Sequence, residues 1–347
     1  MAQQAAGQPP FTWGIVGTGT IAARFARDLA LVDGAALGAV HSRSEQKGRD
    51  FAQALAIPRS CHELDRFLAD PALDAVYIAT PNHLHVPQAL AAIAAGKPAL
   101  IEKPIALTAT EVGAIAEVSR KHGVFAMEAM WTRFLPAVAA ARRQIADGRI
   151  GTIRRIDAEL AYRREPDDSR FFDPALGGGA ALDLGVYALS LTLQLLGPPE
   201  RVEAGQVKAS SGVDLRSDFR LHYPGAVAEL SCGFDRDGGN RFLIEGSAGA
   251  LRLEAPFLKA KRLTHYTPTA LASPLSAPRA SASFARKLLD RLPLPGRHQE
   301  QYDFPGEGLQ FQAMAVMEAV RAGAWECETM PLAESAAVLR VIGAARA

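Results

Sequence analysis

Three residues of contrasting chemistry, Glu102, Lys103 and Pro104, follow one another at the end of an apolar run. A helix interior disfavours the proline and the centre of a sheet disfavours the charges, whereas the carboxyl edge of a parallel sheet accepts all three. Ligands bind at that edge in open α/β folds, so Lys103 could polarise a ligand hydroxyl or transfer its proton. Glu102 could orient the lysine or contact a cofactor. On its own, the segment is more simply interpreted as a strand-end salt bridge.

A glycine pattern near the N-terminus is typical of a dinucleotide-binding turn. The segment GTGTIA at residues 17–22 has the G-x-G-x-x-A spacing and lies between an apolar run and a helix-like segment. The glycines permit a tight turn and close approach of the backbone to a pyrophosphate, and Ala22 is small enough for close helix–strand packing. The N–H groups that open the helix would bind the phosphates. Alone, the spacing is equally compatible with a plain strand–helix turn. The expected cofactor contacts are Gly17, Thr18, Gly19, Thr20 and Ile21.

The end of the second apolar run bears on the choice between NAD and NADP. Folds that prefer NAD usually place Asp or Glu there, to accept hydrogen bonds from the ribose 2′-hydroxyl. This chain has Ser42 and Arg43, and the first acidic residue after the run is Glu45. A hydroxyl and a guanidinium can bind a 2′-phosphate, which a carboxylate would repel. We therefore expect NADP as the cofactor, with NAD as the alternative. Lys47 could be a further contact, although a solvated helix lysine is the simpler interpretation.

The segment ATPNHLH at residues 79–85 ends another apolar run. Its proline ends the strand, and two short polar side chains follow the same edge of the sheet. His83 and His85 are two residues apart, a spacing that does not put two ligands on one helix face, and no other ligand cluster is near in sequence. We therefore expect no metal site and interpret His83 as a surface or helix-starting residue. The cofactor contacts expected here are Thr80, Pro81 and Asn82.

A fourth segment, GGGAALDLGVY at residues 177–187, combines glycines with two polar groups. Three glycines allow a backbone to approach a ligand closely. Asp183 and Tyr187 are four residues apart, so on a helix they share one face and could hydrogen-bond a polyol. If Lys103 lies close, its charge lowers the pKa of Tyr187 and the phenolate could accept a proton. Taken alone, a helix start with one acid and an amphipathic tyrosine is the simpler interpretation.

The elements that must position these residues fall into two parts. Through residue 130, short apolar runs alternate with helix-like segments, which predicts an α/β Rossmann domain with a doubly wound parallel sheet over 1–130. The runs are 13–16, 36–40, 75–79, 99–101 and 124–127.

From residue 131 to 347 the pattern predicts an α+β domain. Alternation of period two recurs in several segments, which indicates a large open, mainly antiparallel sheet. An apolar helix is expected at 180–196. Residues 262–300 are rich in Ala, Ser and Pro and are expected to be a loop-like insertion, with one amphipathic piece at 284–292.

Composition excludes several classes of protein. The 38 basic and 37 acidic residues give a net charge of +1, which offers no general attraction to nucleic acid or anionic lipid. Three scattered cysteines without C-x-x-C spacing disfavour a disulfide framework or zinc site. The N-terminus has no signal-peptide pattern, and no uncharged apolar run is long enough to span a membrane. We expect a cytoplasmic protein that binds neither nucleic acid nor membrane.

In combination, these segments resemble the glucose–fructose oxidoreductase, inositol dehydrogenase and rhizopine-catabolism (Gfo/Idh/MocA) family. The similarity runs from WGIVGTGTIA through IEKP and GGGAALDLGVYAL to MPLAESAAVLRVI. It implies that Lys103 is the catalytic residue and that Asp183 is the acid of the glycine-led helix. MEAMWTRFLP and Tyr187, where many relatives have histidine, are most similar to the dihydrodiol dehydrogenase and NADP-dependent D-xylose dehydrogenase branch.

The resemblance implies further site residues and an assembly. Glu128, Trp131 and Arg133 would border the nicotinamide and substrate pocket, and His85 would lie beside the cofactor. The family fold is a Rossmann domain followed by an α/β domain with an open antiparallel sheet. Members often dimerise or tetramerise through that sheet, so a homodimer or homotetramer is expected.

We expect an NADP-dependent oxidoreductase that transfers hydride between nicotinamide and a secondary alcohol of a sugar, polyol or cyclic trans-diol. Lys103 and Tyr187 would handle the hydroxyl proton, and Asp183 would hold the substrate or orient its partners. Two alternatives remain open at this point. One is a non-catalytic sensor or regulator that keeps the dinucleotide site. The other is NAD-dependent glycoside cleavage, in which hydride leaves and returns.

Overall fold

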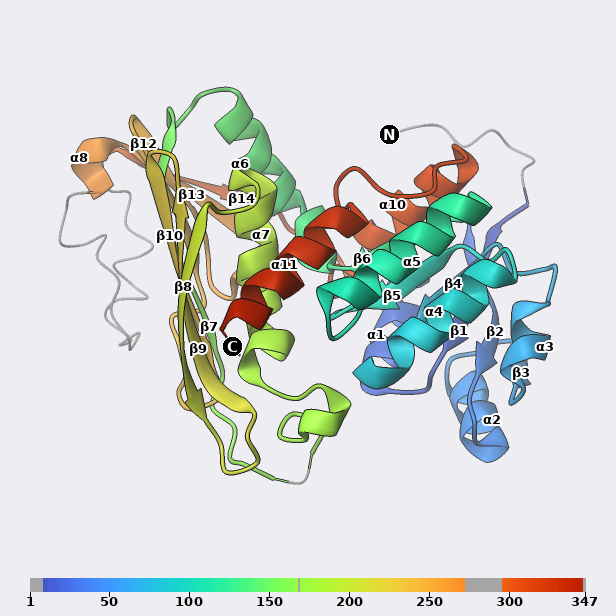
Figure 1. Cartoon of the computed structure of the whole chain (residues 1–347). Coiled ribbons are helices and arrows are strands. Elements are labelled where there is room, and N and C mark those ends of the chain that lie inside the picture. Colours follow the sequence, from blue (N-terminus) through green and yellow to red (C-terminus); the bar gives the residue numbers. More distant parts are fainter. Residues whose placement is uncertain (1–8, 168, 272–294, 346–347) are drawn as a thin grey trace. The chain divides into compact units, whose positions relative to one another are not determined.

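The computed structural model describes residues 9–167, 169–271 and 295–345, which group into two compact units (Figure 1). The first unit contains the described residues up to Ala106 together with Thr110–Trp131 and Pro305–Ala333. The second unit contains Leu107–Ala109, Thr132–Phe304 and the described residues from Glu334 onward. Each unit is built around one sheet.

The first unit contains a parallel sheet of six strands. They are β1 (Phe11–Val16), β2 (Ala35–His41), β3 (Arg59–Cys61), β4 (Ala75–Ile78), β5 (Ala99–Glu102) and β6 (Ala126–Ala129), in the order β3-β2-β1-β4-β5-β6. All neighbouring pairs are parallel, and β4, β5 and β6 are buried along their whole length. Strands covered on both faces must be apolar throughout, which explains the short apolar runs of the sequence. The predicted doubly wound parallel sheet is confirmed.

Helices connect these strands, and Figure 1 shows α4 and α5 side by side on one face of the sheet. The helices of this unit are α1 (Thr20–Leu29), α2 (Glu45–Ala54), α3 (Leu64–Leu68), α4 (His85–Ala94), α5 (Ala109–His122) and α10 (Gln310–Arg321). Strand β3 and helix α3 were not predicted from the sequence. The three residues of β3 are exposed or half-buried, so they form no apolar run that would have indicated a strand.

A segment from the C-terminal third belongs to the first unit. Asp28, buried at the end of α1, accepts hydrogen bonds from the backbone N–H groups of Glu307, Gly308 and Leu309 at 2.9–3.0 Å. These groups precede α10, so the carboxylate serves as an N-terminal cap for that helix from a different part of the chain. The sequence-based division at residue 130 had assigned this segment to the second domain.

The second unit contains a sheet of eight described strands. They are β7 (Ile153–Ala161), β8 (Arg201–Lys208), β9 (Asp214–Tyr223), β10 (Ala226–Gly233), β11 (Phe242–Gly246), β12 (Gly249–Leu253), β13 (Arg262–Tyr266) and β14 (Arg297–Gln301). Their order is β14-β13-β12-β11-β7-β10-β9-β8. Strands β7 and β10 pair in parallel and the other neighbours are antiparallel. The predicted open, mainly antiparallel sheet is therefore confirmed.

The prediction of a loop-like insertion over residues 262–300 is wrong at both ends of that range. Residues 262–266 form β13, which pairs with β12, and α8 (Pro268–Leu271) follows. Residues 297–301 form β14, whose sequence RHQEQ is polar; among the described strands it is the last of the sheet and pairs with β13 alone. A polar edge strand lacks the apolar alternation by which strands are recognised. The amphipathic piece at 284–292 lies outside the described residues.

The helices of the second unit include the predicted apolar helix. They are α6 (Pro136–Ala146), the π-helical turn η4 (Ala181–Gly185), α7 (Val186–Leu196) and α11 (Leu332–Ala344), whose residues from Glu334 belong to this unit. Among the described helices, the stretch Pro174–Leu196 alone is long and apolar enough to cross a membrane by length and composition. Within it, 78% of the tested window is buried in the structure, as in the core helix of a folded domain.

Candidate active site

The glycine turn after β1 has the backbone that a dinucleotide needs. Gly17 has a φ of +114°, and a Cβ placed there would lie 2.6 Å from the carbonyl oxygen of Ala79, so only glycine fits. Gly19 caps α1 without a side-chain hydrogen bond, and a Cβ there would meet no described atom within 4 Å. The N–H groups that open α1 therefore face a space that a phosphate could enter, and the turn fits a bound NAD(P). Ala22 is fully buried, as close helix–strand packing requires.

A group of basic side chains lies where β2 and β3 end. Ser42 is buried, and Arg43 and Lys47 are exposed. His41 is buried, and its pKa is lowered mainly by burial and also by the charges of His62 and Arg43, so these three side chains are neighbours. The sequence reasoning found Arg43 but not the two histidines, because the proximity of His62 depends on the unpredicted strand β3. His41 could have been identified from the sequence, because it directly precedes Ser42 and Arg43 in the segment HSRS.

Hydrogen bonds fix the segment after β4. His85 is fully buried at the start of α4, and its Nδ1 and Nε2 lie 2.8 Å from the carbonyl oxygens of Pro104 and Thr80. The Thr80 hydroxyl donates to Gln88 at 2.6 Å, and Asn82 is buried. Across the parts of the chain that the structure describes, no group of three His, Cys, Asp or Glu side chains could hold a metal ion. His85 thus ties the ends of β4 and β5 together.

The carboxyl end of β5 carries a buried acid next to the candidate catalytic lysine. Glu102 is 6% exposed and Lys103 is half-buried. The Tyr77 hydroxyl donates to Glu102 Oε1, and the backbone N–H of Lys103 donates to Oε2 at 3.1 Å. Burial raises the pKa of Glu102 to about 7, against the opposing effects of the Tyr77 hydrogen bond and the Lys103 charge. Tyr77 is therefore a site residue that sequence reasoning missed.

A second acid lies near the same turn. Glu128 of β6 is 4% exposed, and its Oε1 accepts the backbone N–H of Ile105 at 3.0 Å. Its negative charge contributes to raising the pKa of Glu102. Together the two carboxyl groups hold the backbone on both sides of Pro104, whose peptide bond with Lys103 is cis. Trp131, just beyond β6, is also buried.

In the second unit, Asp183 and Tyr187 lie on successive turns, as the sequence predicts, but a π-helical turn connects them. Asp183 is in η4, and Tyr187 is in the first turn of α7. Asp183 Oδ1 lies 3.7 Å from a guanidinium nitrogen of Arg170. The pKa of Tyr162 is raised by burial and then by Tyr187, which places the two phenols near each other. Widened turns of this kind are frequent at functional sites.

The glycines that precede this helix are explained by packing within the unit. A Cβ on Gly178 would lie 2.6 Å from the carbonyl oxygen of Phe171, and one on Gly179 would lie 2.1 Å from Asp214 Oδ1. Asp214 is buried, and its Oδ2 accepts the backbone N–H of Ala181 at 2.7 Å. These glycines therefore allow two parts of the chain to approach each other closely. This explanation replaces the interpretation that they allow the backbone to approach a ligand. Asp214, which sequence reasoning missed, fixes the start of the helix.

Arg133 is anchored within the second unit. Its guanidinium is buried and donates to the Ser190 hydroxyl at 2.7 Å, to the Ser190 carbonyl at 2.6 Å, and to Glu334. These bonds join the segment after Thr132 to α7 and α11. The contacts that the structure gives Arg133 are those of an anchor, and a contact with cofactor stays a prediction.

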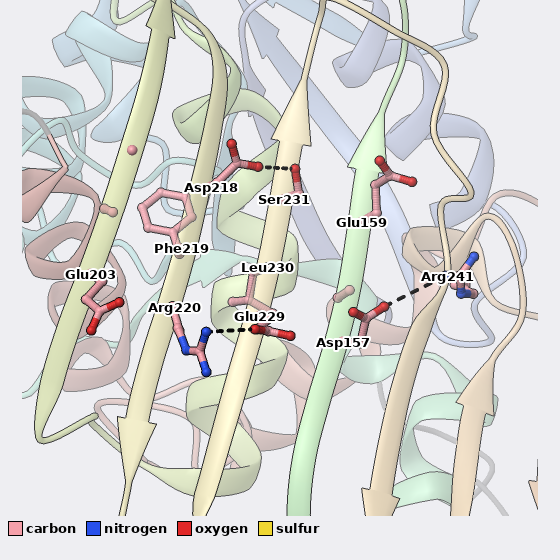
Figure 2. Close-up of a pocket in the computed structure, with 13 residues that line it drawn as sticks. Asp157, Glu159, Glu203, Asp218, Phe219, Arg220, Glu229, Leu230, Ser231 and Arg241 are labelled. Carbon is pink, nitrogen blue, oxygen red and sulfur yellow. Dashed lines mark hydrogen bonds and ion pairs between the residues drawn. The ribbon is translucent and has the colours of Figure 1, made fainter. Parts of the chain in front are cut away.

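A shallow pocket of about 520 Å³ lies on the second sheet, and none of its lining residues is a predicted site residue. Figure 2 shows that its lining comes from neighbouring strands and carries both charges. Arg220 pairs with Glu229 at 3.3 Å, and Arg241 lies 3.8 Å from Asp157. We call this surface the sheet-face pocket. The buried residues Phe219 and Leu230 alternate along their strands with these charged residues.

Comparison with known proteins agrees with this arrangement. Residues 11–130 match the family described as "Oxidoreductase family, NAD-binding Rossmann fold" (GFO_IDH_MocA), and residues 138–252 match the GFO/IDH/MocA C-terminal domain. Trans-1,2-dihydrobenzene-1,2-diol dehydrogenase of Bos taurus is 30% identical over 329 residues, which cover 93% of this chain and 92% of that protein.

Solved structures share the fold over nearly the whole chain. KijD10, a 3-ketoreductase from Actinomadura kijaniata in complex with NADP, has a TM-score of 0.79 at 21% identity and 97% coverage of both chains. A levoglucosan dehydrogenase in complex with NADH and levoglucosan gives the same three values. The sequence match to the bovine enzyme, over both domains, decides the assignment. The chain therefore belongs to the Gfo/Idh/MocA family and is an NAD(P)-dependent oxidoreductase.

Proposed function

We propose that this protein is an NADP-dependent dehydrogenase or reductase that acts on a secondary alcohol of a sugar, a polyol or a cyclic trans-diol. The position of Lys103 is the observation that carries the proposal. It follows β5 at the same sheet edge as the glycine turn after β1, because the carboxyl ends of parallel strands meet at one edge. The name of the bovine relative, a trans-diol dehydrogenase, supports the diol as one substrate class.

Each residue has a distinct part in this reaction. The glycine turn would hold the pyrophosphate, and the bound nicotinamide would supply or accept the hydride at C4. Lys103 polarises the substrate hydroxyl, and Tyr187 exchanges its proton. Asp183, held by Arg170, accepts a hydrogen bond from a second substrate hydroxyl. A vicinal diol or a sugar presents two adjacent hydroxyls and so suits one group for proton transfer and one for positioning.

The preference for NADP is supported by the basic side chains at the ends of β2 and β3. Arg43 is exposed and can form a bidentate pair with a 2′-phosphate. His62 lies near enough to His41 to affect the pKa of His41, so a second basic side chain lies at this end of the sheet. No carboxylate occupies the position that usually accepts the ribose 2′-hydroxyl of NAD.

The test is a panel of pentoses, hexoses, polyols and trans-dihydrodiols, with NADP⁺ and NAD⁺ in parallel, followed by reduced-nicotinamide absorbance. Turnover of at least one class is expected, with higher kcat/KM for NADP⁺. Lys103→Met should keep NADP⁺ binding and lose about 10²-fold or more in turnover. Normal turnover by that variant refutes the role of Lys103. Tight cofactor binding without turnover of any member would favour a sensor, and sugar release without cofactor reduction would favour glycoside cleavage.

We also propose that a second copy of the chain covers the sheet-face pocket. Its lining has interspersed charges of both signs, so two copies related by a twofold axis could pair opposite charges. Gly205 lines the pocket on β8, and a Cβ there meets no described atom within 4 Å. Gly205→Arg should therefore keep the fold and dissociate the oligomer in analytical ultracentrifugation. Gly113→Arg, on the exposed side of α5, is the control that should leave the mass unchanged.

A further inference from the structure

A buried hydrogen-bonded pair lies behind Lys103. Tyr77 of β4 is fully buried, and its ring stacks on Phe25 of α1 with centroids 3.9 Å apart and planes at 22°. Tyr77 is in register with Leu100 of β5, so Glu102, two residues further along β5, lies on the same face of the sheet. The Tyr77 hydroxyl donates to Glu102 Oε1 across the two strands.

Glu102 connects this bond to the candidate catalytic lysine. Its second oxygen accepts the backbone N–H of Lys103, so both oxygens of the carboxyl group are held. The titratable groups around it within this unit come from each neighbouring element. Lys103 stabilises the anion and Glu128 of β6 destabilises it. His85 of α4 has its Nδ1 2.8 Å from the carbonyl oxygen of Pro104, two residues after Glu102.

The balance between these effects leaves the carboxyl group close to its midpoint at neutral pH. Burial raises the pKa of Glu102 to about 7, and the hydrogen bond from Tyr77 is the largest effect in the opposite direction. Without that bond the neutral acid would predominate at pH 7. The charge next to Lys103 therefore depends on one phenolic hydroxyl.

We propose that Tyr77 is a positioning residue for Lys103: its hydroxyl fixes the Glu102 carboxyl group and favours the carboxylate over the neutral acid beside the lysine. The proposal rests on the proposed function, because Lys103 matters here as the group that polarises the substrate hydroxyl. A neighbouring carboxylate favours the ammonium form of Lys103, and a neutral acid leaves more of the free amine. Tyr77 thus affects the protonation of Lys103 through the carboxyl group of Glu102.

Two variants separate the bond from the charge. Tyr77→Phe keeps the ring that stacks on Phe25 and removes only the hydroxyl. Glu102→Gln keeps an acceptor for Tyr77 and removes the charge at every pH. Tyr223→Phe is the matched control, because the buried Tyr223 hydroxyl in β9 has no hydrogen-bond partner among the residues that the structure describes.

The first measurement follows Glu102 directly by carbon NMR of protein isotope-labelled at glutamate side-chain carboxyl groups. The resonance that disappears in Glu102→Gln is assigned to Glu102. It should titrate near pH 7 in the wild type. In Tyr77→Phe its midpoint should rise by about one pH unit or more, the shift expected when a hydrogen bond to a charged group is lost. Tyr223→Phe should leave the midpoint in place.

The second measurement follows Lys103. Competitive labelling with acetic anhydride, quantified by peptide mass spectrometry, reports the fraction of free amine at each pH. At pH 7, where Glu102 is about half ionised in the wild type, Lys103 should be acetylated up to about twofold faster in Tyr77→Phe than in the wild type. Glu102→Gln should give the upper limit of this increase at all pH values. The difference between Tyr77→Phe and the wild type should vanish well above the raised midpoint, where Glu102 is ionised in both.

Either of two results would overturn the proposal. One is a Glu102 resonance that titrates near the ordinary value of 4.5 or does not move in Tyr77→Phe. The other is equal Lys103 labelling in the wild type and Glu102→Gln, a comparison that remains valid if Tyr77→Phe fails to fold. Neither measurement uses turnover. Lack of dehydrogenase activity would therefore count against the proposed function without affecting these outcomes.

Discussion

The buried carboxyl group of Glu102 should make the stability of the first unit depend on pH. In the folded chain the pKa of Glu102 is raised from 4.5 to about 7, chiefly by burial. The folded state therefore holds this proton more tightly than the unfolded state does. Stability is full below pH 4.5, and it falls as pH rises towards 7, because the unfolded chain ionises freely while the folded chain must bury a charge.

The size of the effect follows from the two pKa values. They differ by about 2.5 pH units, and each unit corresponds to about 1.4 kcal/mol of differential stability, which gives about 3 kcal/mol in total. The residue is 6% exposed, so solvent screening does not reduce this figure greatly. Glu102→Gln cannot ionise and should lose this dependence. The free energy of unfolding of the variant, relative to the wild type, should rise by about 2 to 3 kcal/mol between pH 5 and pH 8.

The assay is urea unfolding of both proteins over that pH range at constant ionic strength, followed by tryptophan fluorescence. All three tryptophans, Trp13, Trp131 and Trp325, belong to the first unit, so the signal reports the unit that contains Glu102. Using the difference between variant and wild type cancels the other titrating groups. Glu117→Gln on the surface of α5 controls for loss of a carboxyl group as such. A difference between Glu102→Gln and wild type that stays constant within about 0.5 kcal/mol would refute the reasoning.

Three further predictions concern the cofactor and the fold. Arg43→Ala should weaken NADP⁺ binding about 10-fold or more in calorimetry while NAD⁺ binding changes little, and an equal loss for both would contradict a 2′-phosphate contact. Gly17→Ala should abolish measurable NADP⁺ binding, because the alanine Cβ would lie 2.6 Å from a backbone oxygen and the residue has a φ of +114°. Gly96→Ala is the control and should bind NADP⁺ normally, because Gly96 also has a positive φ, +72°, but faces open space. Asp28→Ala should destabilise the first unit by about 3 kcal/mol in urea unfolding, because three backbone N–H groups lose their acceptor. Asp28→Asn keeps one acceptor oxygen and should be less destabilised than Asp28→Ala.

The cofactor-binding part of the fold could be predicted from the sequence because its signals are local. The glycine turn lies between a strand and a helix that are adjacent in the chain, and buried parallel strands are recognisable as apolar runs. The Lys103 segment was found for the same reason, since charges at the end of an apolar run point to the edge of a sheet. The short exposed strand β3 carries no such signal, and the basic group around His62 was missed with it.

Interactions between distant parts of the chain could not be predicted. Asp28 and Asp214 are buried acids whose partners are backbone N–H groups at residues 307–309 and 181. A backbone N–H group has no sequence signature, so nothing in the chain identifies the acceptor's partner in advance. Tyr77 was missed because its strand is buried throughout and was interpreted as core, although a phenol in such a strand must place its hydroxyl against an acceptor.

The involvement of residues 305–333 in the first unit has a consequence for how the protein is made. In the order of strands, β6 is the last of the parallel sheet, and the backbone N–H of its Ala126 bonds to the carbonyl of Trp325 at 3.1 Å. On the ribosome, the first 130 residues emerge long before this partner exists. The edge strand of the nascent sheet and the Asp28 carboxylate therefore remain without these partners until nearly the whole polypeptide has been translated. We expect the N-terminal domain expressed alone to be prone to aggregation, and to be rescued by a peptide that spans residues 305–333 supplied in trans.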